Sequence, residues 1–432
     1  MTERREIRIE VPVLARVEGE GALDLAIREG RITALRLHIY EPPRLFEKLL
    51  EGRSFQDVPD AVARICGICP VAYQMSAVRA IESAFGVEVT SWVETMRRLF
   101  YCGEWIESHA LHIHLLAAPD FFGCDSVIAL AEKEPEAVRR GLRLQALGNE
   151  IIRFLGGRSV HPVGVCVGGF HRSPTAAEAA TLRQRLIEAL PEAEALVGWC
   201  AALPLPEDEQ DFECVSLAES GRYPMMGERI VSDRALDIPI ADFAQVFEER
   251  QVPHSTALHC LLRGRPYLVG PLARLNLHLG QLPPDVRERA AATGIRWPSR
   301  NMYHSVVARA VEILFALREA IDLLAHYRET GQPAVAVRPR AAEGFGASEA
   351  PRGLLWHHYV FDEAGYVRQA RIVPPTSQNQ ARIEEDLAAN LTAFGLERDE
   401  VALRLRAEQV IRNYDPCISC ATHFLRLRLE RS

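Results

Sequence analysis

The chain has 432 residues, of which 48% are apolar and 25% are charged, and its formal net charge is −8. This composition is typical of a globular protein with enough apolar material for a large buried core. The mild acidity gives no basic face for nucleic acid, so we expect no nucleic-acid partner. The sequence contains no apolar run of about eighteen residues, so no membrane-spanning helix is predicted.

The N-terminal segment, MTERREIRIEVPV, has neither the apolar core of a signal peptide nor a twin-arginine leader. We therefore expect a cytoplasmic protein. Ten cysteines in a large leaderless chain are not expected to form a disulfide framework. Six of them sit singly and are interpreted as small buried apolar side chains: Cys102, Cys124, Cys166, Cys200, Cys214 and Cys260.

Strands are predicted in the first forty residues, where IRIEVPV alternates and where ALDLAI and ITALRLHIYE flank the turn REG. From Pro43 onward the pattern becomes helical. Pro70 and Gly86 are typical start and stop signals for a helix between them, and Ser173-Pro174 is a start signal for a later one. Helices are predicted over residues 70–85, 91–118, 134–155, 175–202, 303–328 and 381–393.

Two other segments complete the predicted organisation. GGRSVHPVGVCVGGFHRSP is rich in glycine and predicts a loop with sharp turns. HHYVFDEAGYVRQARIV predicts two strands joined at DEAG. We therefore expect a mainly α (α+β) fold, with a large helical core and small peripheral sheets at the start and near residues 355–375. The sequence shows no repeat or clear linker, which predicts one domain over residues 1–432.

The remaining four cysteines form two C-x-x-C pairs, Cys66/Cys69 and Cys417/Cys420. Roughly 0.23 such pairs are expected if ten cysteines are scattered at random through a chain of this length, so two require a cause. If the pairs meet, they offer four thiolates, which select zinc, iron, copper(I) or nickel. Cys69 lies at the predicted start of a helix, where the helix dipole favours a thiolate.

Three kinds of site remain open from the residues alone. Two C-x-x-C pairs usually bind a structural zinc ion, although the ligands of such a site normally lie within a few tens of residues of one another in the sequence. An iron–sulfur cluster is the second alternative. A catalytic metal with an open coordination position is the third. The wide separation of the pairs suits a site that ties both ends of the chain into a buried core.

Five ordered segments resemble nickel–iron hydrogenase large subunits. RICGICPVAYQMSAV resembles the family's N-terminal cysteine motif, and DPCISCATH resembles its C-terminal motif. ARVEGEG, PRLFEKLLEGR and EAPRGLLWH resemble three further shared blocks. The likeness spans residues 12–423, which is nearly the whole chain. Together, the order and placement of the five segments are far more specific than either C-x-x-C pair.

The resemblance implies a nickel–iron centre. Cys66 and Cys417 would be terminal ligands on nickel, and Cys69 and Cys420 would bridge nickel and iron. The iron would carry carbon monoxide and cyanide ligands, which no sequence rule predicts.

The resemblance also assigns roles around the metals. Glu18 would exchange protons beside a nickel-bound thiolate, although alone it would be interpreted as a solvated glutamate at a strand end. Arg352 would project over the open face of the metals. Glu47 and His423 would ligate a magnesium ion, with a backbone carbonyl near residues 370–372. Two more residues would orient these ligands: Asp415 and His161.

Two positions depart from common family patterns. Tyr73 stands where many members have a histidine, and a tyrosine hydroxyl cannot shuttle protons near neutral pH as imidazole can. Ser108 stands where membrane-bound members often have an aspartate before the first histidine of the segment 109–114. Ser108, the absence of a leader and the sequence ISCATH together favour the cytoplasmic, NAD(P)-linked branch of the family.

The function implied is reversible heterolytic cleavage of H2 to protons and electrons. Electrons would pass to an iron–sulfur small subunit and then to NAD(P) through flavin subunits. Nickel-insertion proteins and a maturation protease would be further partners, and the protease would remove residues 424–432 after His423. Two alternatives remain: a cysteine-ligated subunit of a respiratory complex without hydrogenase activity, and a structural zinc protein. Neither would contain nickel.

Overall fold

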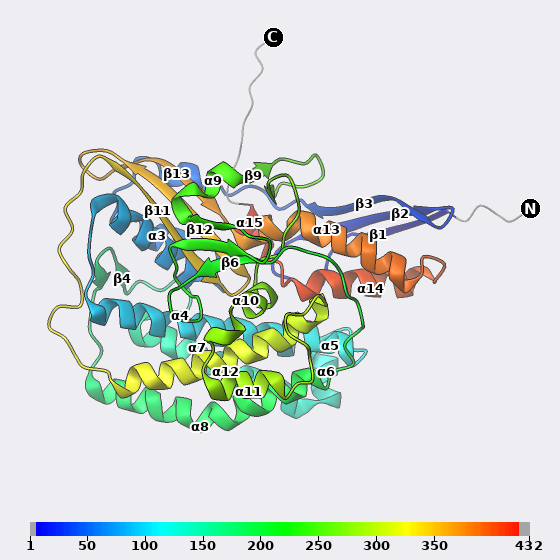
Figure 1. Ribbon diagram of the computed structural model, residues 1–432, viewed down its shortest axis with the longest axis horizontal. Coiled ribbons are helices and arrows are strands. Elements are labelled where there is room, and N and C mark those ends of the chain that lie inside the picture. Colours follow the sequence, from blue (N-terminus) through cyan, green and yellow to red (C-terminus); the bar gives the residue numbers. More distant parts are fainter. Residues whose placement is uncertain (1–5, 423–432) are drawn as a thin grey trace, which may run out of the picture.

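A computed structural model describes residues 6–422 of the chain. A layer of long helices lies along one side, and small antiparallel sheets lie on the other (Figure 1). The expected mainly helical core with small peripheral sheets is confirmed. No helix within residues 6–422 is long and apolar enough to cross a membrane.

The helical layer is built from α4 (Ser91–Leu111), α7 (Pro135–Gly156), α8 (Ala176–Ala201) and α12 (Ser305–Ala325). All four confirm predicted helices. α4 runs on through a π-helical turn, His112–Ala117, into α5 (Ala118–Phe121), so the predicted helix 91–118 is continuous but not uniformly α-helical. The start signal predicted for α8 is wrong by two residues. Thr175 is the N-cap and forms a capping box with Glu178.

Four sheets and a short hairpin accompany the helices. The predicted N-terminal strands form β1 (Glu6–Val11), β2 (Gly21–Arg28) and β3 (Arg31–Ile39), and the predicted later patch forms β12 (Gly353–Phe361) and β13 (Val367–Val373), joined by β11 (Ala342–Ala350). The other strands are short and were not predicted: β4 (Val165–Cys166), β5 (Gly169–Phe170), β6 (Val215–Ala218), β7 (Arg229–Ser232), β8 (Asp237–Pro239), β9 (Phe247–Arg250) and β10 (His259–Leu262).

The remaining helices link these parts. α3 (Pro70–Phe85) and its left-handed Gly86 cap agree with the prediction, and α13 (Pro375–Phe394) starts six residues earlier than the predicted 381–393. The others are α1 (Phe46–Leu50), α2 (Val58–Val62), α6 (Val127–Lys133), α9 (Phe243–Val246), α10 (Pro271–His278), α11 (Pro284–Ala291), α14 (Glu400–Asn413) and α15 (Ile418–Ala421).

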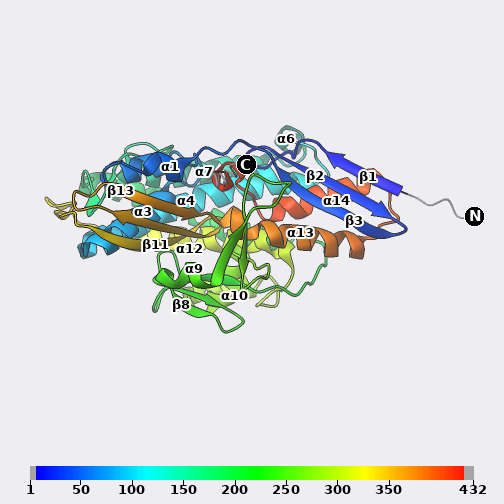
Figure 2. The ribbon, with the colours of Figure 1, turned by 90° about the horizontal axis from the view of Figure 1, so that it is seen from above.

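The two largest apolar clusters form most of the core. The larger joins α3, α4, α7, α8 and α12 and includes all four cysteines of the C-x-x-C pairs. The second packs β1–β3 against α13 and α14 (Figure 2). Five of the six isolated cysteines are buried as predicted, whereas Cys166 in β4 is half-buried.

A close crossing of α4 and α7 depends on two glycines. A Cβ atom at Gly148 would lie 2.5 Å from the Glu107 backbone nitrogen and 2.6 Å from the Gly103 carbonyl oxygen. A Cβ at Gly103 would lie 2.9 Å from the Gly148 carbonyl oxygen. The two backbones therefore leave no room for a side chain at this point, and the crossing fixes the position of α4.

Replacing Gly148 by alanine is expected to destabilise the full-length chain by roughly 1–3 kcal/mol, because the helix backbones must separate. Gly198→Ala in α8 is the matched control, since a Cβ there meets nothing within 4 Å and alanine is worth up to about 1 kcal/mol more than glycine in a helix. The measurement is the urea midpoint of each variant. A midpoint for Gly148→Ala at or above that of the unmodified chain would contradict the crossing as described.

Candidate metal centre

The two C-x-x-C pairs lie in turns that enter helices. Cys66 and Cys69 follow α2, and Cys69 is the N-cap residue of α3, which starts at Pro70. Cys417 is the N-cap residue of α15, and Cys420 lies within that helix. All four side chains are buried. Cys69 therefore lies at the start of a helix, as the sequence predicted, and Cys417 lies at the start of another.

The four sulfur atoms meet although Cys66 and Cys417 are 351 residues apart. The Sγ–Sγ distances are 3.4 Å for Cys66–Cys417, 3.6 Å for Cys69–Cys420 and 2.7 Å for Cys417–Cys420. All four sulfurs lie within 4.8 Å of one another, and none forms a disulfide. Such spacing is suitable for thiolates around a shared metal centre.

The thiol of Cys66 differs electrostatically from the others. Hydrogen bonds from the thiols of Cys417, Cys420 and Cys69 hold the pKa of Cys66 well below its ordinary value. Burial raises the pKa of Cys417. The Cys66 sulfur also accepts the backbone N–H groups of Ile68 and Cys69, at 3.3 and 3.4 Å. One thiolate is thus stabilised in a site that burial otherwise makes unfavourable for charge.

Glu18 links the N-terminal segment to the second cysteine pair. Its backbone carbonyl accepts the N–H of Ile418 at 2.9 Å, in a parallel β-bridge between Glu18 and Cys417. Its carboxylate oxygen Oε2 accepts the Ser419 N–H at 3.0 Å and lies 3.1 Å from the Cys417 sulfur. The carboxylate therefore faces a thiol of the cluster and is not a freely solvated strand-end group.

Arg44 joins the two cysteine motifs and was missed by the sequence reasoning. Its guanidinium donates to the Ile65 carbonyl at 2.5 Å and to the Ser419 carbonyl, next to Cys66 and Cys420 respectively. Its backbone N–H donates to the Thr422 carbonyl at 2.7 Å. One side chain thus holds the backbone of both motifs. Arginine that binds carbonyl oxygens has no sequence signature, so only the fold identifies it.

Arg352 lies buried beside the cluster. Its Nε donates to the Asp415 carbonyl at 2.7 Å, and its Nη2 is 3.2 Å from the Asp415 carboxylate. Burial opposes its charge, but Asp415 and Cys417 raise the pKa of the guanidinium. Its Nη1 is buried without a hydrogen-bond partner among residues 6–422. A buried orphan donor normally costs about 1–3 kcal/mol, so this nitrogen is available to an additional acceptor.

Asp415 also connects the cluster to a buried charged network. Its other carboxylate oxygen is 3.3 Å from Arg309, whose guanidinium donates to His109 at 3.2 Å. The opposite ring nitrogen of His109 bonds Glu312 at 2.8 Å, so the proton of His109 is on Nε2. Glu312 in turn pairs with Arg274 at 2.7 Å. Although burial favours the neutral acid, Arg274 and His109 lower the pKa of Glu312 to about 2.

Glu104 supports the start of α3 from α4. Its carboxylate accepts the N–H groups of Val71 and Ala72, at 2.6 and 3.0 Å. These are two of the donors that a helix leaves unsatisfied at its first turn, immediately after Cys69. Burial nevertheless raises the pKa of Glu104 well above its ordinary value. This residue was also absent from the sequence-based site.

The other predicted site residues have the following positions. Glu47 in α1 accepts the Ile372 N–H at 2.7 Å, so it lies against the segment 370–372. Tyr73 is buried in α3, and burial together with Cys420 raises the pKa of its hydroxyl. The Nδ1 atom of His161 donates to the Ala63 carbonyl at 2.7 Å. His423 lies outside the described residues.

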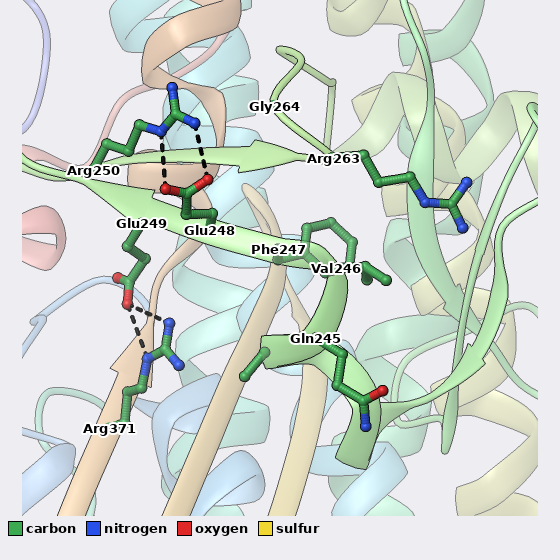
Figure 3. Close-up of a pocket in the computed structure, with 10 residues that line it drawn as sticks. Gln245, Val246, Phe247, Glu248, Glu249, Arg250, Arg263, Gly264 and Arg371 are labelled. Atoms are coloured by element: carbon green, nitrogen blue, oxygen red, sulfur yellow. Dashed lines mark hydrogen bonds and ion pairs between the residues drawn. The ribbon is translucent and has the colours of Figure 1, made fainter.

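A surface pocket of about 650 Å³ on β9 is separate from these residues (Figure 3). Its carboxylates are already matched by arginines, because Arg250 donates to Glu248 at 3.0 Å and Arg371 donates to Glu249 at 2.9 Å. Among the described residues, the four cysteines, Glu18, Glu47 and Arg352 do not line it, whereas Arg371 of the segment 370–372 does. This pocket therefore carries no functional assignment, and the candidate site is built on the cysteine cluster.

The donor set fits a thiolate-bound metal centre. Four buried sulfurs from two distant turns can share one site, and soft ligands of this kind select nickel or iron over magnesium or calcium. The unpartnered Nη1 of Arg352 supplies a donor beside it. The fold and the site together define a cysteine-ligated metalloprotein built on a helical core.

The comparisons with known proteins identify the family. The family model for nickel-dependent hydrogenases matches residues 44–141 and 261–423, which include both cysteine motifs. Sulfhydrogenase 2 subunit alpha of Pyrococcus furiosus is 34% identical, with 97% of this chain and 100% of that protein covered. The chain belongs to the nickel-dependent hydrogenase family.

Two further relatives extend the comparison. NAD-reducing hydrogenase HoxS subunit beta of Cupriavidus necator is 27% identical, with 97% of this chain and 95% of that protein covered. A crystal structure of an NAD⁺-reducing [NiFe]-hydrogenase in the H2-reduced state has a TM-score of 0.88 and 28% identity, covering 96% of this chain and 99% of that one. The fold expected from the resemblance is therefore confirmed.

Replacing Arg44 by methionine is expected to lower the nickel content per chain and to reduce stability by roughly 1.5–3 kcal/mol, because two backbone carbonyls lose a charged donor. Arg185→Met is the matched control, since Arg185 forms an exposed pair with Glu150 at 2.5 Å that is worth less than about 1 kcal/mol. The measurements are nickel by plasma mass spectrometry and the thermal midpoint. Equal losses in both variants would show that Arg44 does not join the motifs.

Proposed function

We propose that the chain is the catalytic large subunit of a nickel–iron hydrogenase that cleaves H2 reversibly. The convergence of four buried thiols from the two ends of the chain carries this proposal. Cys66, Cys69, Cys417 and Cys420 would hold the nickel–iron centre, whose iron would carry carbon monoxide and cyanide. When bound, this centre supplies the site at which H2 is split heterolytically.

Glu18 receives the proton in this proposal. Its Oε2 atom lies 3.1 Å from the Cys417 sulfur, which is within reach for direct proton transfer. The Ser419 N–H and the backbone bridge to Cys417 hold the carboxylate in that position. Arg352 acts beside the metals as a fixed positive charge and donor, supported by its buried, unpartnered Nη1.

Glu47, His423 and a backbone carbonyl near residues 370–372 would hold a magnesium ion. The contact between Glu47 and the Ile372 N–H supports the proximity of two of these three ligands. Magnesium prefers oxygen ligands, so Glu47 and the carbonyl suit it, whereas the histidine rests on the family pattern.

Electrons leave through an iron–sulfur small subunit and reach NAD(P) through flavin subunits in a cytoplasmic heteromultimer. The similarity to the NAD-reducing hydrogenases supports this branch. The relative of higher identity is named a sulfhydrogenase, so the electron acceptor is the part of the proposal that an assay must decide. We place the whole chain, residues 1–432, in one catalytic domain.

The complex purified with its partner subunits is expected to contain about one nickel per large subunit and infrared bands of cyanide and carbonyl. Glu18→Gln should keep the metals but lose at least about 100-fold in H2 oxidation, because general acid–base groups contribute roughly 10²–10⁴-fold. Glu20→Gln, at an exposed neighbouring position, should keep full activity.

Three outcomes would contradict this function. Zinc in place of nickel, with no infrared bands in a matured sample, would favour a structural subunit without hydrogenase activity. Full activity of Glu18→Gln would remove Glu18 from the proton route. H2-dependent reduction of an artificial dye without reduction of NAD⁺ or NADP⁺ would support hydrogenase activity but contradict the assignment to the NAD(P)-linked branch.

We also propose that residues 424–432 are removed by a maturation protease after nickel-insertion proteins have loaded the site. The tail FLRLRLERS lies outside the described residues, so this proposal rests on the family pattern. The intact mass of the active large subunit is expected to correspond to a chain ending at His423. A mass that includes all of residues 424–432 in active enzyme would overturn the proposal.

A further inference from the structure

A second cluster of metal-ligating side chains lies apart from the cysteines. His254, His259 and Glu384 each offer one ligand atom, and these atoms lie within 4.8 Å of one another. His254 is in the loop between β9 and β10, His259 is the first residue of β10, and Glu384 is in α13. The cluster thus draws on three segments, and none of its residues was singled out by the sequence analysis.

The hydrogen bonds of the cluster leave one histidine ring nitrogen without a partner among the described residues. His254 Nε2 lies 2.8 Å from Glu384 Oε1, and the Leu37 N–H donates to the same oxygen at 2.9 Å. The Nε2 atom of His259 is buried and has no hydrogen-bond partner within residues 6–422. Leaving it unsatisfied would cost about 1–3 kcal/mol, and a metal ion would satisfy it.

The backbone around the cluster is held in place. Thr256, between the two histidines, donates its N–H to the Ile39 carbonyl at 2.7 Å and its hydroxyl to the Glu41 carbonyl at 2.9 Å. The hairpin of β9 and β10 pairs His259 with Arg250 in register. α13 packs against β10 (Figure 1), and Ile39 at the end of β3 forms a β-bridge with Ser255 in the loop between β9 and β10. The ligands therefore sit on a framework that the chain's own hydrogen bonds hold in place.

The cluster is accessible from the surface. A pocket of about 820 Å³ is lined by His38, Tyr40, Gln251 and His254 among others. The side chains of His254 and Glu384 are 18% and 20% exposed. Burial lowers the pKa of His259, which favours the neutral ring that can coordinate an ion. An ion and a coordinating water can thus reach the site.

We propose that His254, His259 and Glu384 bind a divalent transition-metal ion of the zinc type, with water from the adjoining pocket as the fourth ligand. Two imidazoles and one carboxylate are a common zinc ligand set, whereas magnesium and calcium prefer oxygen alone. The ion replaces the direct contact between His254 and Glu384 and takes a ring nitrogen of His259 as its third protein ligand.

The bound ion connects this region to the cysteine cluster. It ties the β9–β10 hairpin to α13, and the first turn of α13 carries Thr376, whose hydroxyl accepts the Cys417 N–H at 3.0 Å. Its role is therefore to fix α13, and the site takes no part in H2 chemistry. Ligands that bind the folded state alone stabilise it, so the thermal midpoint rises with ion concentration.

The test uses the purified complex with its cysteine centre loaded, dialysed against a weak chelator and titrated with Co²⁺ and Zn²⁺. One equivalent of Co²⁺ is expected to bind and to show the visible absorption of a four-coordinate ion. His259→Gln and Glu384→Gln should each weaken binding at least tenfold. The amide oxygen introduced by Glu384→Gln can still accept the Leu37 N–H. Weaker binding by this variant therefore reflects the loss of a metal ligand and not a loss of folding.

His358→Gln is the matched control, because His358 pairs with Glu343 at 3.1 Å and has no third metal-ligating side chain beside it within residues 6–422. It should bind the ions as tightly as the unmodified complex. Nickel content and H2 oxidation should be unchanged in all three variants, which verifies folding independently of the second site. Absence of Co²⁺ binding by the unmodified complex, or equal binding by His259→Gln and Glu384→Gln, would overturn the proposal.

Discussion

The contact between Glu18 and the turn at Cys417 is the constraint on which the metal centre depends. Four thiols can share a buried site only if both ends of the chain are held against the same helical core. A parallel β-bridge aligns Glu18 with Cys417, and Arg44 donates to carbonyls beside both cysteine pairs. Closing so long a loop costs conformational entropy. These backbone contacts offset that cost, together with the burial of the apolar cluster between β1–β3, α13 and α14.

Buried charged side chains form a continuous network beside the cluster. Arg352 and Arg309 both reach Asp415, and the chain of contacts continues through His109 and Glu312 to Arg274. Buried charges of this kind are costly when unpaired, so removing one member leaves another uncompensated. The network therefore fixes the rotamer of Arg352 more than it adds net stability.

Local patterns in the sequence predicted the long helices, the first sheet and both cysteine motifs, because each signal lies within a few residues. The range predicted for α8 was correct within one residue, but its N-cap is Thr175, which forms a capping box with Glu178, and not Ser173 two residues earlier. The short strands between residues 203 and 270 have too few residues for a periodic signal. Arg44 and Glu104 bind backbone groups far away in the chain, and no local pattern encodes such contacts.

The position of the second cysteine pair also determines when the site can exist. Proteins are synthesised from the N-terminus, and domains begin to fold during synthesis. Cys66, Glu18 and Arg44 all emerge early from the ribosome, whereas Cys417 follows Cys66 by 351 residues. The growing chain therefore holds half of a metal site while most of the helical core is still being made, and the turn at Cys417 closes that site late in biogenesis.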